Sequence, residues 1–152
     1  MKAQNMNWIP EIGEVYLMRF CGDGSEQNGW RPGVVYQNNK GNIHSPNIIA
    51  LPLTTDMKST WQPTHVFLPA KKTGLLKDSL CLCESPERMG KQKIGRYLTR
   101  LPPKYLSRIA KANLLATSAI SYLDPKELPE IWEQASMLNN AIKAREKAGD
   151  HV

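Results

Sequence analysis

Short apolar runs separated by turn-forming residues fill the first hundred positions of the chain. These runs predict five strands and favour a sixth at the last segment, over residues 15–20, 33–37, 47–53, 64–68, 79–83 and 93–98. Clusters of Gly, Asn and Ser break them, including a loop over 21–25 and a turn over 38–42. We expect Pro52 to mark a sheet edge or a bulge, because proline has no N–H for a strand ladder. Strands this short and closely spaced favour a small, strongly bent barrel.

The apolar positions change to a helical spacing after Pro102 and Pro103, where proline suits a first helical turn. The face expected to lie against the barrel consists of Leu106, Ile109, Ala110, Asn113 and Leu114. A second helix is expected to follow near Pro125 or Pro129, with Asp124 as its N-cap. Its apolar stripe consists of Leu128, Ile131, Trp132, Ala135, Leu138 and Ile142. We expect this stripe to dock on the same core.

The net charge of +6 is unevenly distributed. Residues 1–60 are neutral, residues 61–115 carry 11 basic against 3 acidic side chains, and residues 116–152 carry 4 against 6. A basic stripe of this kind is the expected footprint of phosphate-backbone binding, which suits a nucleic acid. The N-terminus has no apolar signal core and no run of about 18 apolar residues occurs, so we expect a cytoplasmic protein with no membrane segment.

The spacing of the cysteines and histidines along the sequence does not indicate a metal-binding site or a catalytic site. Cys81 and Cys83 lie two apart on a predicted strand, so they point to one face and are expected to be buried, reduced thiols. The histidines, His44, His65 and His151, follow no catalytic or zinc-binding spacing. HExxH, phosphate-loop and paired-carboxylate motifs are missing, which argues against zinc hydrolysis and nucleotide-driven chemistry. We therefore expect neither a metal nor a cofactor.

Side chains that could bind a substrate or take part in catalysis are concentrated in one loop, which leads directly into a predicted strand. The loop offers a hydroxyl, a carboxylate, an amide, an indole and a guanidinium, from Ser25, Glu26, Gln27, Trp30 and Arg31. A guanidinium presents a planar fork that matches phosphate oxygens and stays charged, so it can stabilise an oxyanion. The composition alone fits equally a solvated hairpin loop whose arginine caps a backbone carbonyl.

Several short sequence motifs occur in a particular order and spacing along most of the chain. They include Gly13-Glu14-Val15-Tyr16, Ser25-Glu26-Gln27, Arg31-Pro32, Gly41-Asn42, Leu53-Thr54, Pro63-Thr64-His65-Val66 and Lys77-Asp78-Ser79. Each string is weak alone, but together they resemble the MazF/PemK/Kid family of toxins from type II toxin–antitoxin systems. The resemblance covers roughly residues 12–116.

That family implies a mainly β fold with C-terminal helices: a small SH3-like barrel of the CcdB/PemK type, packed by helices. On this basis residues 12–116 are the barrel domain and residues 117–152 a C-terminal helical extension. The family also implies a homodimer with an RNA groove formed by both subunits. Its catalytic arginine and threonine match Arg31 and Thr54, and its acidic residue matches Glu26, as a base or an RNA contact. The RNA contacts expected are Ser25, Glu26, Gln27, Trp30 and Ser85.

The implied reaction is metal-independent, sequence-specific cleavage of single-stranded mRNA. The ribose 2′-OH attacks the adjacent phosphate and leaves a 2′,3′-cyclic phosphate and a free 5′-OH. Because the nucleophile belongs to the substrate, the enzyme needs only Arg31 and the Thr54 hydroxyl at the phosphoryl oxygens. Glu26 would accept the 2′-OH proton or hold a base. Splayed bases explain the preference for single strands. The family also implies a cognate antitoxin whose acidic tail enters the groove.

Two features depart from the family pattern. Where many relatives have Gln, an apolar residue and Arg after a Glu, this chain has Ser85, Pro86 and a displaced Arg88. This change bears on the recognised RNA sequence and on dimer contacts. The extension 117–152 has no family role, and we expect it to dock in cis rather than extend the dimer or cover the groove.

Three of the four tryptophans divide into one candidate base-stacking residue and two packing residues. Trp30, beside Arg31, is placed to stack on a base. Trp61 is expected to pack, and Trp132 to be buried on the tail helix.

Two other functions suit the same barrel. A gyrase-poisoning toxin of the CcdB type relies on a C-terminal helix that ends in a Trp-containing tripeptide, whereas this chain ends Ala148-Gly149-Asp150-His151-Val152. A catalytically silent RNA-binding barrel is disfavoured by the presence of both Arg31 and Thr54. The sequence specifies neither the RNA motif that is cut nor the identity of the antitoxin.

Overall fold

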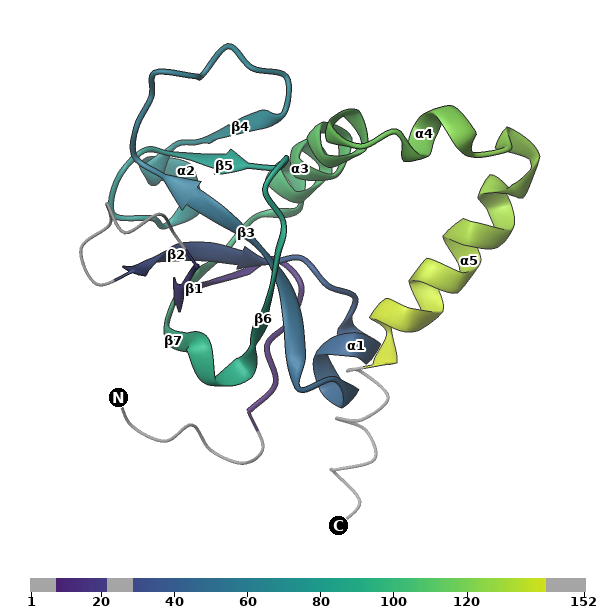
Figure 1. Ribbon diagram of the computed structural model, residues 1–152, viewed down its shortest axis with the longest axis horizontal. Helices are drawn as coiled ribbons and strands as arrows, with labels where there is room; N and C mark the ends of the chain where they lie inside the picture. Colours follow the sequence, from purple (N-terminus) through teal and green to yellow (C-terminus); the bar gives the residue numbers. More distant parts are fainter. Residues whose placement is uncertain (1–7, 22–28, 142–152) are drawn as a thin grey trace.

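A computed structural model describes residues 8–21 and 29–141 and shows a bent antiparallel sheet followed by helices (Figure 1). The strands are β1 (Glu14–Arg19), β2 (Trp30–Val35), β3 (Asn47–Thr54), β4 (His65–Leu68), β5 (Ser79–Leu82), β6 (Glu87–Gly90) and β7 (Ile94–Arg100). They pair in the order β4-β5-β3-β2-β1-β7, and β6 pairs with β3. The mainly β fold with C-terminal helices is therefore confirmed, and every strand predicted from sequence is present, with small shifts at the ends.

β3 is paired on both sides, so Pro52 does not lie at a sheet edge, the first of the two positions expected for it. Pro52 is buried and lies opposite Gly33 of β2. On the other side of β3, β6 pairs with residues 47–50 and β5 pairs only from Leu53 onward. The proline falls between these two ladders, where a missing N–H breaks no strand pairing.

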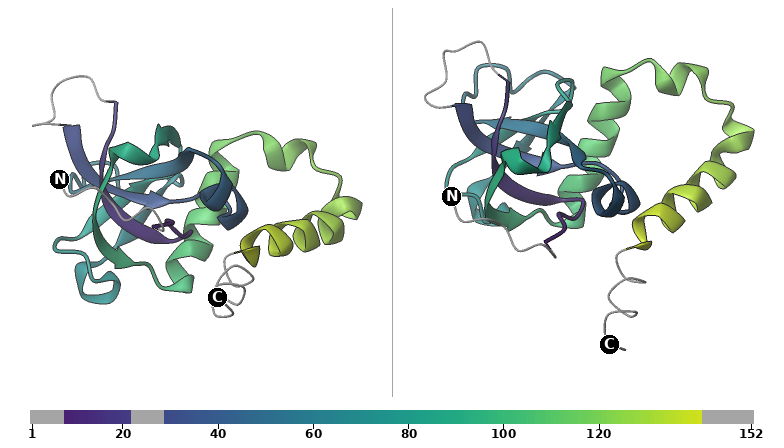
Figure 2. Two further views of the ribbon diagram at one scale, coloured as in Figure 1. Left: turned by 90° about the horizontal axis from the view of Figure 1, so that it is seen from below. Right: turned by 60° about the horizontal axis from the view of Figure 1, so that its bottom comes forward.

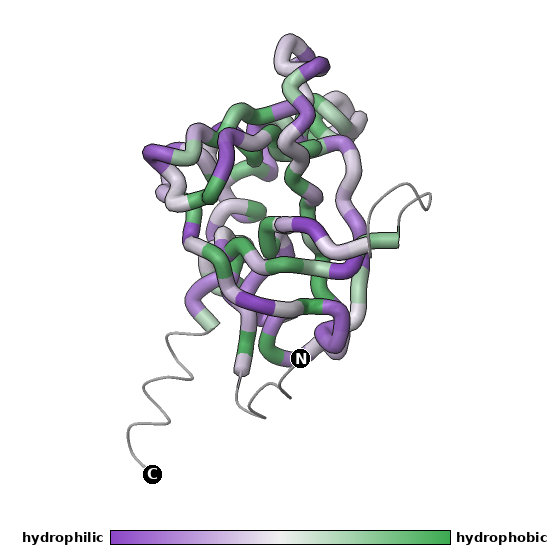
Figure 3. Tube along the Cα trace, turned by 90° about the vertical axis from the view of Figure 1, so that its left-hand side faces the viewer, coloured by the Kyte–Doolittle hydropathy of each residue, from purple (hydrophilic) through white to green (hydrophobic). Residues whose placement is uncertain are grey.

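Two hydrophobic clusters cover the two faces of the sheet, because successive side chains alternate between them. Figure 3 shows the hydrophobic positions interspersed with hydrophilic ones along the strands. The first cluster contains Val15, Val34, Leu51, Leu53, Cys81, Cys83, Tyr105 and Ile109, among others. The second contains Tyr16, Met18, Phe20, Val35, Ile48, Ala50, Met89 and Ile94. The expected burial of the Cys81 and Cys83 thiols on one face is confirmed.

Besides the 3₁₀ turn over Lys91–Lys93 and a short helix over Ala119–Tyr122, three short elements were not predicted. The expected turn over 38–42 is instead largely taken up by helix α1 (Asn39–His44), because the Asn38 side chain accepts the Gly41 N–H and caps it. Helix α2 (Ala70–Thr73) ends at Gly74, whose φ of 79° is the left-handed conformation that glycine adopts readily. Strand β6 is the third, and it falls in the segment where the sequence departs from the family pattern.

Helix α3 (Pro103–Ala116) lies against the barrel as expected, but with a different face. Tyr105, Ile109 and Ala112 are buried, whereas Ala110 and Leu114 are exposed. The Asn113 amide donates to the Cys83 carbonyl at 3.1 Å, which fixes the rotation of the helix against β5. The aromatic ring of Tyr105 fills the core in place of the smaller Ala110.

The chain after α3 forms an arm that arches away from the barrel (Figures 1 and 2). It comprises α4 (Ala119–Tyr122), a 3₁₀ turn over Pro125–Glu127 and α5 (Leu128–Asn139). Asp124 caps the 3₁₀ turn by accepting the Lys126 N–H. The prediction that the apolar stripe docks on the core is wrong for the described residues, and Trp132 is 78% exposed rather than buried. The far end of α5 alone returns to the body of the protein, at α1.

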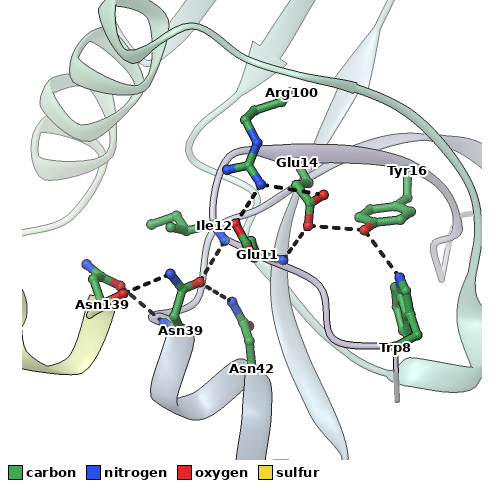
Figure 4. A network of polar contacts seen from close by, with 9 residues as sticks. All are labelled: Trp8, Glu11, Ile12, Glu14, Tyr16, Asn39, Asn42, Arg100 and Asn139. Atoms are coloured by element: carbon green, nitrogen blue, oxygen red, sulfur yellow. Dashed lines mark hydrogen bonds and ion pairs between the residues drawn. The ribbon is translucent and has the colours of Figure 1, made fainter. Parts of the chain in front are cut away.

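A polar network holds both the N-terminal segment and the end of the arm (Figure 4). Asn39 at the start of α1 donates from its backbone and its side chain to Asn139, at 3.1 and 3.0 Å. Arg100 of β7 forms ion pairs with Glu11, at 2.6 Å, and Glu14, at 3.7 Å. Tyr16 donates to Glu14 at 3.1 Å. The network therefore ties the first strand to the last one.

The pKa of Glu14 is raised by burial, which outweighs the hydrogen bonds from Glu11 and Tyr16 and the charge of Arg100. Folded Glu14 thus keeps its proton to a higher pH than the unfolded chain, whose Glu pKa is 4.5. The free energy of unfolding should therefore fall as the pH rises from 4.5 through the folded pKa. We expect Glu14→Gln to flatten this slope in urea titrations from pH 4 to pH 7, with Glu130→Gln on the exposed arm as the control. An unchanged slope would contradict the assignment.

Candidate functional site

The strand register brings Arg31 and Thr54 to one place. The last pair in the β2–β3 ladder is Gly33 with Pro52, and the same antiparallel register continued by two residues sets Arg31 opposite Thr54. Residues that face each other in an antiparallel pair point to the same side of the sheet. Both side chains therefore belong to the face of the second hydrophobic cluster, at the end of the sheet where β2 begins and β3 ends (Figure 1).

Arg31 lies on an aromatic support. Its guanidinium carbon is 5.1 Å from the centre of the Phe20 ring, a distance typical of a cation–π contact. The ring can reach this position because residue 33 is glycine: a Cβ there would be 2.6 Å from Phe20 Cζ and 2.7 Å from Met18 Sδ. Phe20 was not predicted as a site residue, although its alternation with Tyr16 and Met18 places it on the same face.

The Thr54 hydroxyl is oriented by the turn that follows it. Its Oγ1 accepts the backbone N–H of Asp56 at 3.1 Å, and the Asp56 carboxylate in turn accepts the Lys58 N–H. Because the hydroxyl oxygen is used as an acceptor, its own hydrogen is available to donate to a bound group. Thr54 is half-buried at the end of β3. This arrangement positions a hydroxyl donor beside a fixed cation.

The unpredicted strand β6 adds a carboxylate to the same face. Glu87 lies opposite Ala50 of β3, and its Oε1 accepts the Cys21 N–H at 2.9 Å. Glu87 thereby fixes the chain just before the loop that precedes β2. Ser85, predicted to contact RNA, lies exposed in the turn before β6, where its N–H donates to the Leu82 carbonyl. This hydrogen bond fixes the backbone of the turn, and the Ser85 side chain is exposed to solvent.

Three predicted site residues, Ser25, Glu26 and Gln27, lie outside the described residues. The two ends of their loop are nevertheless joined, because the Phe20 N–H donates to the Gly29 carbonyl at 3.1 Å. Gly29 has a φ of 68°, the left-handed conformation that closes such a hairpin readily. Trp30 is half-buried opposite Arg19 in the β1–β2 ladder, next to Arg31.

A histidine fixes the connection between β3 and β4. His65 Nε2 is 2.9 Å from the Glu84 carboxylate, and Nδ1 is 2.9 Å from the Ser59 carbonyl. The ring therefore joins the loop after Thr54 to the turn before β6. Trp61, in this loop, is 79% exposed, so the prediction that it packs is wrong. Its indole lies instead on the surface of the loop between β3 and β4.

The other face of the sheet carries a pocket of about 500 Å³. It is lined by Pro32 and Thr55, the immediate neighbours of Arg31 and Thr54, and by residues of the β5 and β7 regions. Because neighbouring residues in a strand point to opposite faces, this pocket is separated from Arg31 and Thr54 by the sheet. The pocket and the polar pair are therefore two distinct features.

Two negative findings concern the described residues only. No helix among them is long and apolar enough to cross a membrane. Within residues 8–21 and 29–141, no group of three His, Cys, Asp or Glu side chains could hold a metal ion.

Comparisons with known proteins give consistent matches to the barrel. A model of the family described as PemK-like, MazF-like toxin of type II toxin–antitoxin system matches residues 11–115. Endoribonuclease EndoA from Bacillus subtilis (strain 168) is 33% identical over 115 residues, which are 75% of this chain and 99% of EndoA. The family match ends within α3, so the arm lies beyond it.

Solved structures show the same fold. A mycobacterial endoribonuclease in complex with its cognate antitoxin has a TM-score of 0.60 and 26% identity, and the match covers 76% of this chain and 99% of that one. The MazE–MazF structure (Form-II) from Deinococcus radiodurans has a TM-score of 0.61 and 22% identity, covering 77% and 100%. The expected barrel of the CcdB/PemK type is confirmed by these neighbours.

Proposed function

The chain belongs to the PemK-like, MazF-like family of type II toxin–antitoxin toxins, and from this premise we propose that it is a metal-independent endoribonuclease that cuts single-stranded mRNA at a specific sequence. The observation that supports this proposal is that Arg31 and Thr54 each lie two residues beyond Gly33 and Pro52, the last pair of the β2–β3 ladder, so that the continued register would set them on one face of the sheet. The names of the relatives support the reaction class: EndoA and the mycobacterial protein are endoribonucleases.

The residues supply electrostatic stabilisation rather than a nucleophile. The ribose 2′-oxygen attacks the adjacent phosphorus, the P–O5′ bond breaks, and the products are a 2′,3′-cyclic phosphate and a 5′-OH. Negative charge grows on the phosphoryl oxygens, where the Arg31 guanidinium and the Thr54 hydroxyl hydrogen can donate. Phe20 and the Asp56 N–H hold these two groups in place before substrate arrives. Preorganised donors stabilise a transition state because they need not reorient.

Other residues are proposed to accept the 2′-OH proton and to contact the RNA. Glu26 accepts the 2′-OH proton or contacts a base. Ser25, Gln27 and Trp30, from the same hairpin, and Ser85, in the exposed turn before β6, contact bases or phosphates. A requirement for the 2′-OH restricts the substrate to RNA, and accessible base edges restrict it to single strands.

The proposal includes partners and a location. Two relatives were solved with their antitoxins, the mycobacterial protein and the MazE–MazF pair from Deinococcus radiodurans. By analogy this toxin is a homodimer that a cognate antitoxin neutralises through an acidic tail. Residues 61–115, with a net charge of +8 from 11 basic and 3 acidic side chains, would attract such a tail and RNA alike. An mRNA substrate places the toxin in the cytoplasm.

The test is cleavage of a long, unstructured RNA in EDTA, with both product ends mapped. We expect cuts at one short motif, 5′-OH ends that a kinase labels without prior phosphatase treatment, and cyclic phosphates at the 3′ ends. An all-deoxy strand of the same sequence should stay intact. If the RNA stays intact as well, the reaction assigned here is wrong, and a supercoiling assay would then identify a gyrase poison. Cleavage that EDTA abolishes would refute the metal-independent route.

A further inference from the structure

Exposed apolar side chains are concentrated in the arm and the end of α3. They are Leu114, Leu115, Ile120, Tyr122, Leu128, Ile131, Trp132 and Met137. Of the described residues from 117 to 137, none is buried. A concentration of this kind marks a binding surface, because isolated proteins rarely leave large apolar groups together in water. The barrel of the same chain does not cover the apolar surface of the arm. We therefore expect another partner to cover it.

The charge of the arm limits what that partner can be. Residues 117–141 contain Asp124, Glu127, Glu130 and Glu133 but only Lys126, a net charge of −3. An acidic surface repels RNA and an acidic peptide alike. The partner should instead be apolar with basic side chains around it.

The pocket on the far face of the barrel has this chemistry. Leu76, which is 91% exposed, lies on its lining with Leu98, together with the cationic side chains of Lys77 and Arg96. The volume of about 500 Å³ is sufficient to receive an indole. The same chain thus carries an acidic apolar helix and a basic apolar pocket.

The arm and pocket of one chain are kept apart. One end of the arm continues from α3, and the other is held at α1 by the two hydrogen bonds between Asn39 and Asn139. Between these points the arm arches into solvent, as both views in Figure 2 show. With both ends held, the middle of α5 is free to meet a pocket on another molecule.

We propose that α5 of one copy docks into the pocket of a second copy, with Trp132 entering beside Leu76 and Leu98 and with Glu133 facing Lys77 and Arg96. The exchange is reciprocal, so that two arms fill two pockets around a two-fold axis. The arm lies beyond the family match, which ends at residue 115, whereas the pocket lies within it, and the proposal is independent of the catalytic assignment.

Charge reversal in matched pairs tests this docking. Variant A is Glu133→Lys, and variant B is Lys77→Glu with Arg96→Glu. In each variant alone, arm and pocket carry the same sign, and we expect the dimer dissociation constant in sedimentation equilibrium to rise at least about tenfold. A mixture of A and B restores opposite signs at both contacts, so it should form heterodimers close to wild-type strength. Lys58→Glu, exposed in the β3–β4 loop, is the charge-matched control.

Mixing distinguishes docking between chains from docking within one chain. If the arm docked on its own pocket, mixing A with B would restore nothing. That result, or unchanged dissociation constants in both variants, would overturn the proposal. A second readout uses Leu76→Cys and Trp132→Cys on separate chains that also carry Cys21→Ser: oxidation of the mixture should give a covalent dimer. Failure to cross-link while both variants stay folded would also refute the contact.

Discussion

Replacing Arg31 with alanine is expected to reduce RNA cleavage by about 10²–10³-fold or more, because a preorganised donor at the developing charge is lost. Arg31→Lys keeps the positive charge but loses the planar fork and its stacking on Phe20, so it should recover only a small part of the activity. The measurement is single-turnover cleavage of a short RNA that contains the mapped motif, with saturating enzyme, so that binding defects do not enter the rate.

Two controls make the Arg31 result specific. Arg88→Ala removes an exposed guanidinium from β6 and should weaken RNA binding without a comparable loss of single-turnover rate. Thermal unfolding of each variant shows whether the barrel is intact, since the Arg31 side chain packs against a core ring. A folded Arg31→Ala protein that cuts as fast as wild type would remove Arg31 from the mechanism.

Thr54 offers a sharper chemical substitution. Thr54→Val keeps the β-branched shape at the end of β3 but removes the hydroxyl, whereas Thr54→Ser keeps the hydroxyl. We expect the valine variant to lose about 10²-fold in single-turnover rate and the serine variant to keep most of it, since one preorganised donor is removed only in the first case. Valine also loses the acceptor for the Asp56 N–H.

Because that loss could disturb the turn, Asp56→Gly serves as the control for Thr54→Val. It loosens the same turn, including the bond to the Lys58 N–H, without removing the hydroxyl. If Asp56→Gly and Thr54→Val lowered the rate equally, Thr54 would act by shaping the turn rather than by donating to the phosphate. Equal rates for the valine and serine variants would likewise exclude the hydroxyl from the reaction.

The sequence predicted the strands well because their apolar alternation is local information. Residues 15–20 and 47–53 correspond closely to β1 and β3. β6 was missed because Glu87, Arg88 and Gly90 surround Met89, the one buried residue of the strand, which leaves no alternation to detect. Pairing to β3 rather than local preference makes this segment a strand.

The site was predictable only in part, for reasons of geometry. Arg31 and Thr54 are far apart in sequence, and only a strand register can place them opposite each other. The family resemblance supplied the two residues, but not their support: Phe20 and the Asp56 N–H became visible in three dimensions. The helical stripe from Leu128 to Leu138 was likewise correct as a pattern, but a pattern does not say which surface covers it, and the expected one was wrong.

The closure of the hairpin between Phe20 and Gly29 has an evolutionary consequence. The hydrogen bond between these residues fixes where the loop leaves and rejoins the sheet, while Arg31 and Thr54 stand on β2 and β3. Insertions or deletions inside such a loop cost little, since the closure entropy grows by only about 0.6 kcal/mol for each doubling of its length. New RNA preferences can thus arise by exchanging the segment between the two anchors as a cassette. Lineages of these toxins can diversify in their targets while inheriting Arg31 and Thr54 unchanged.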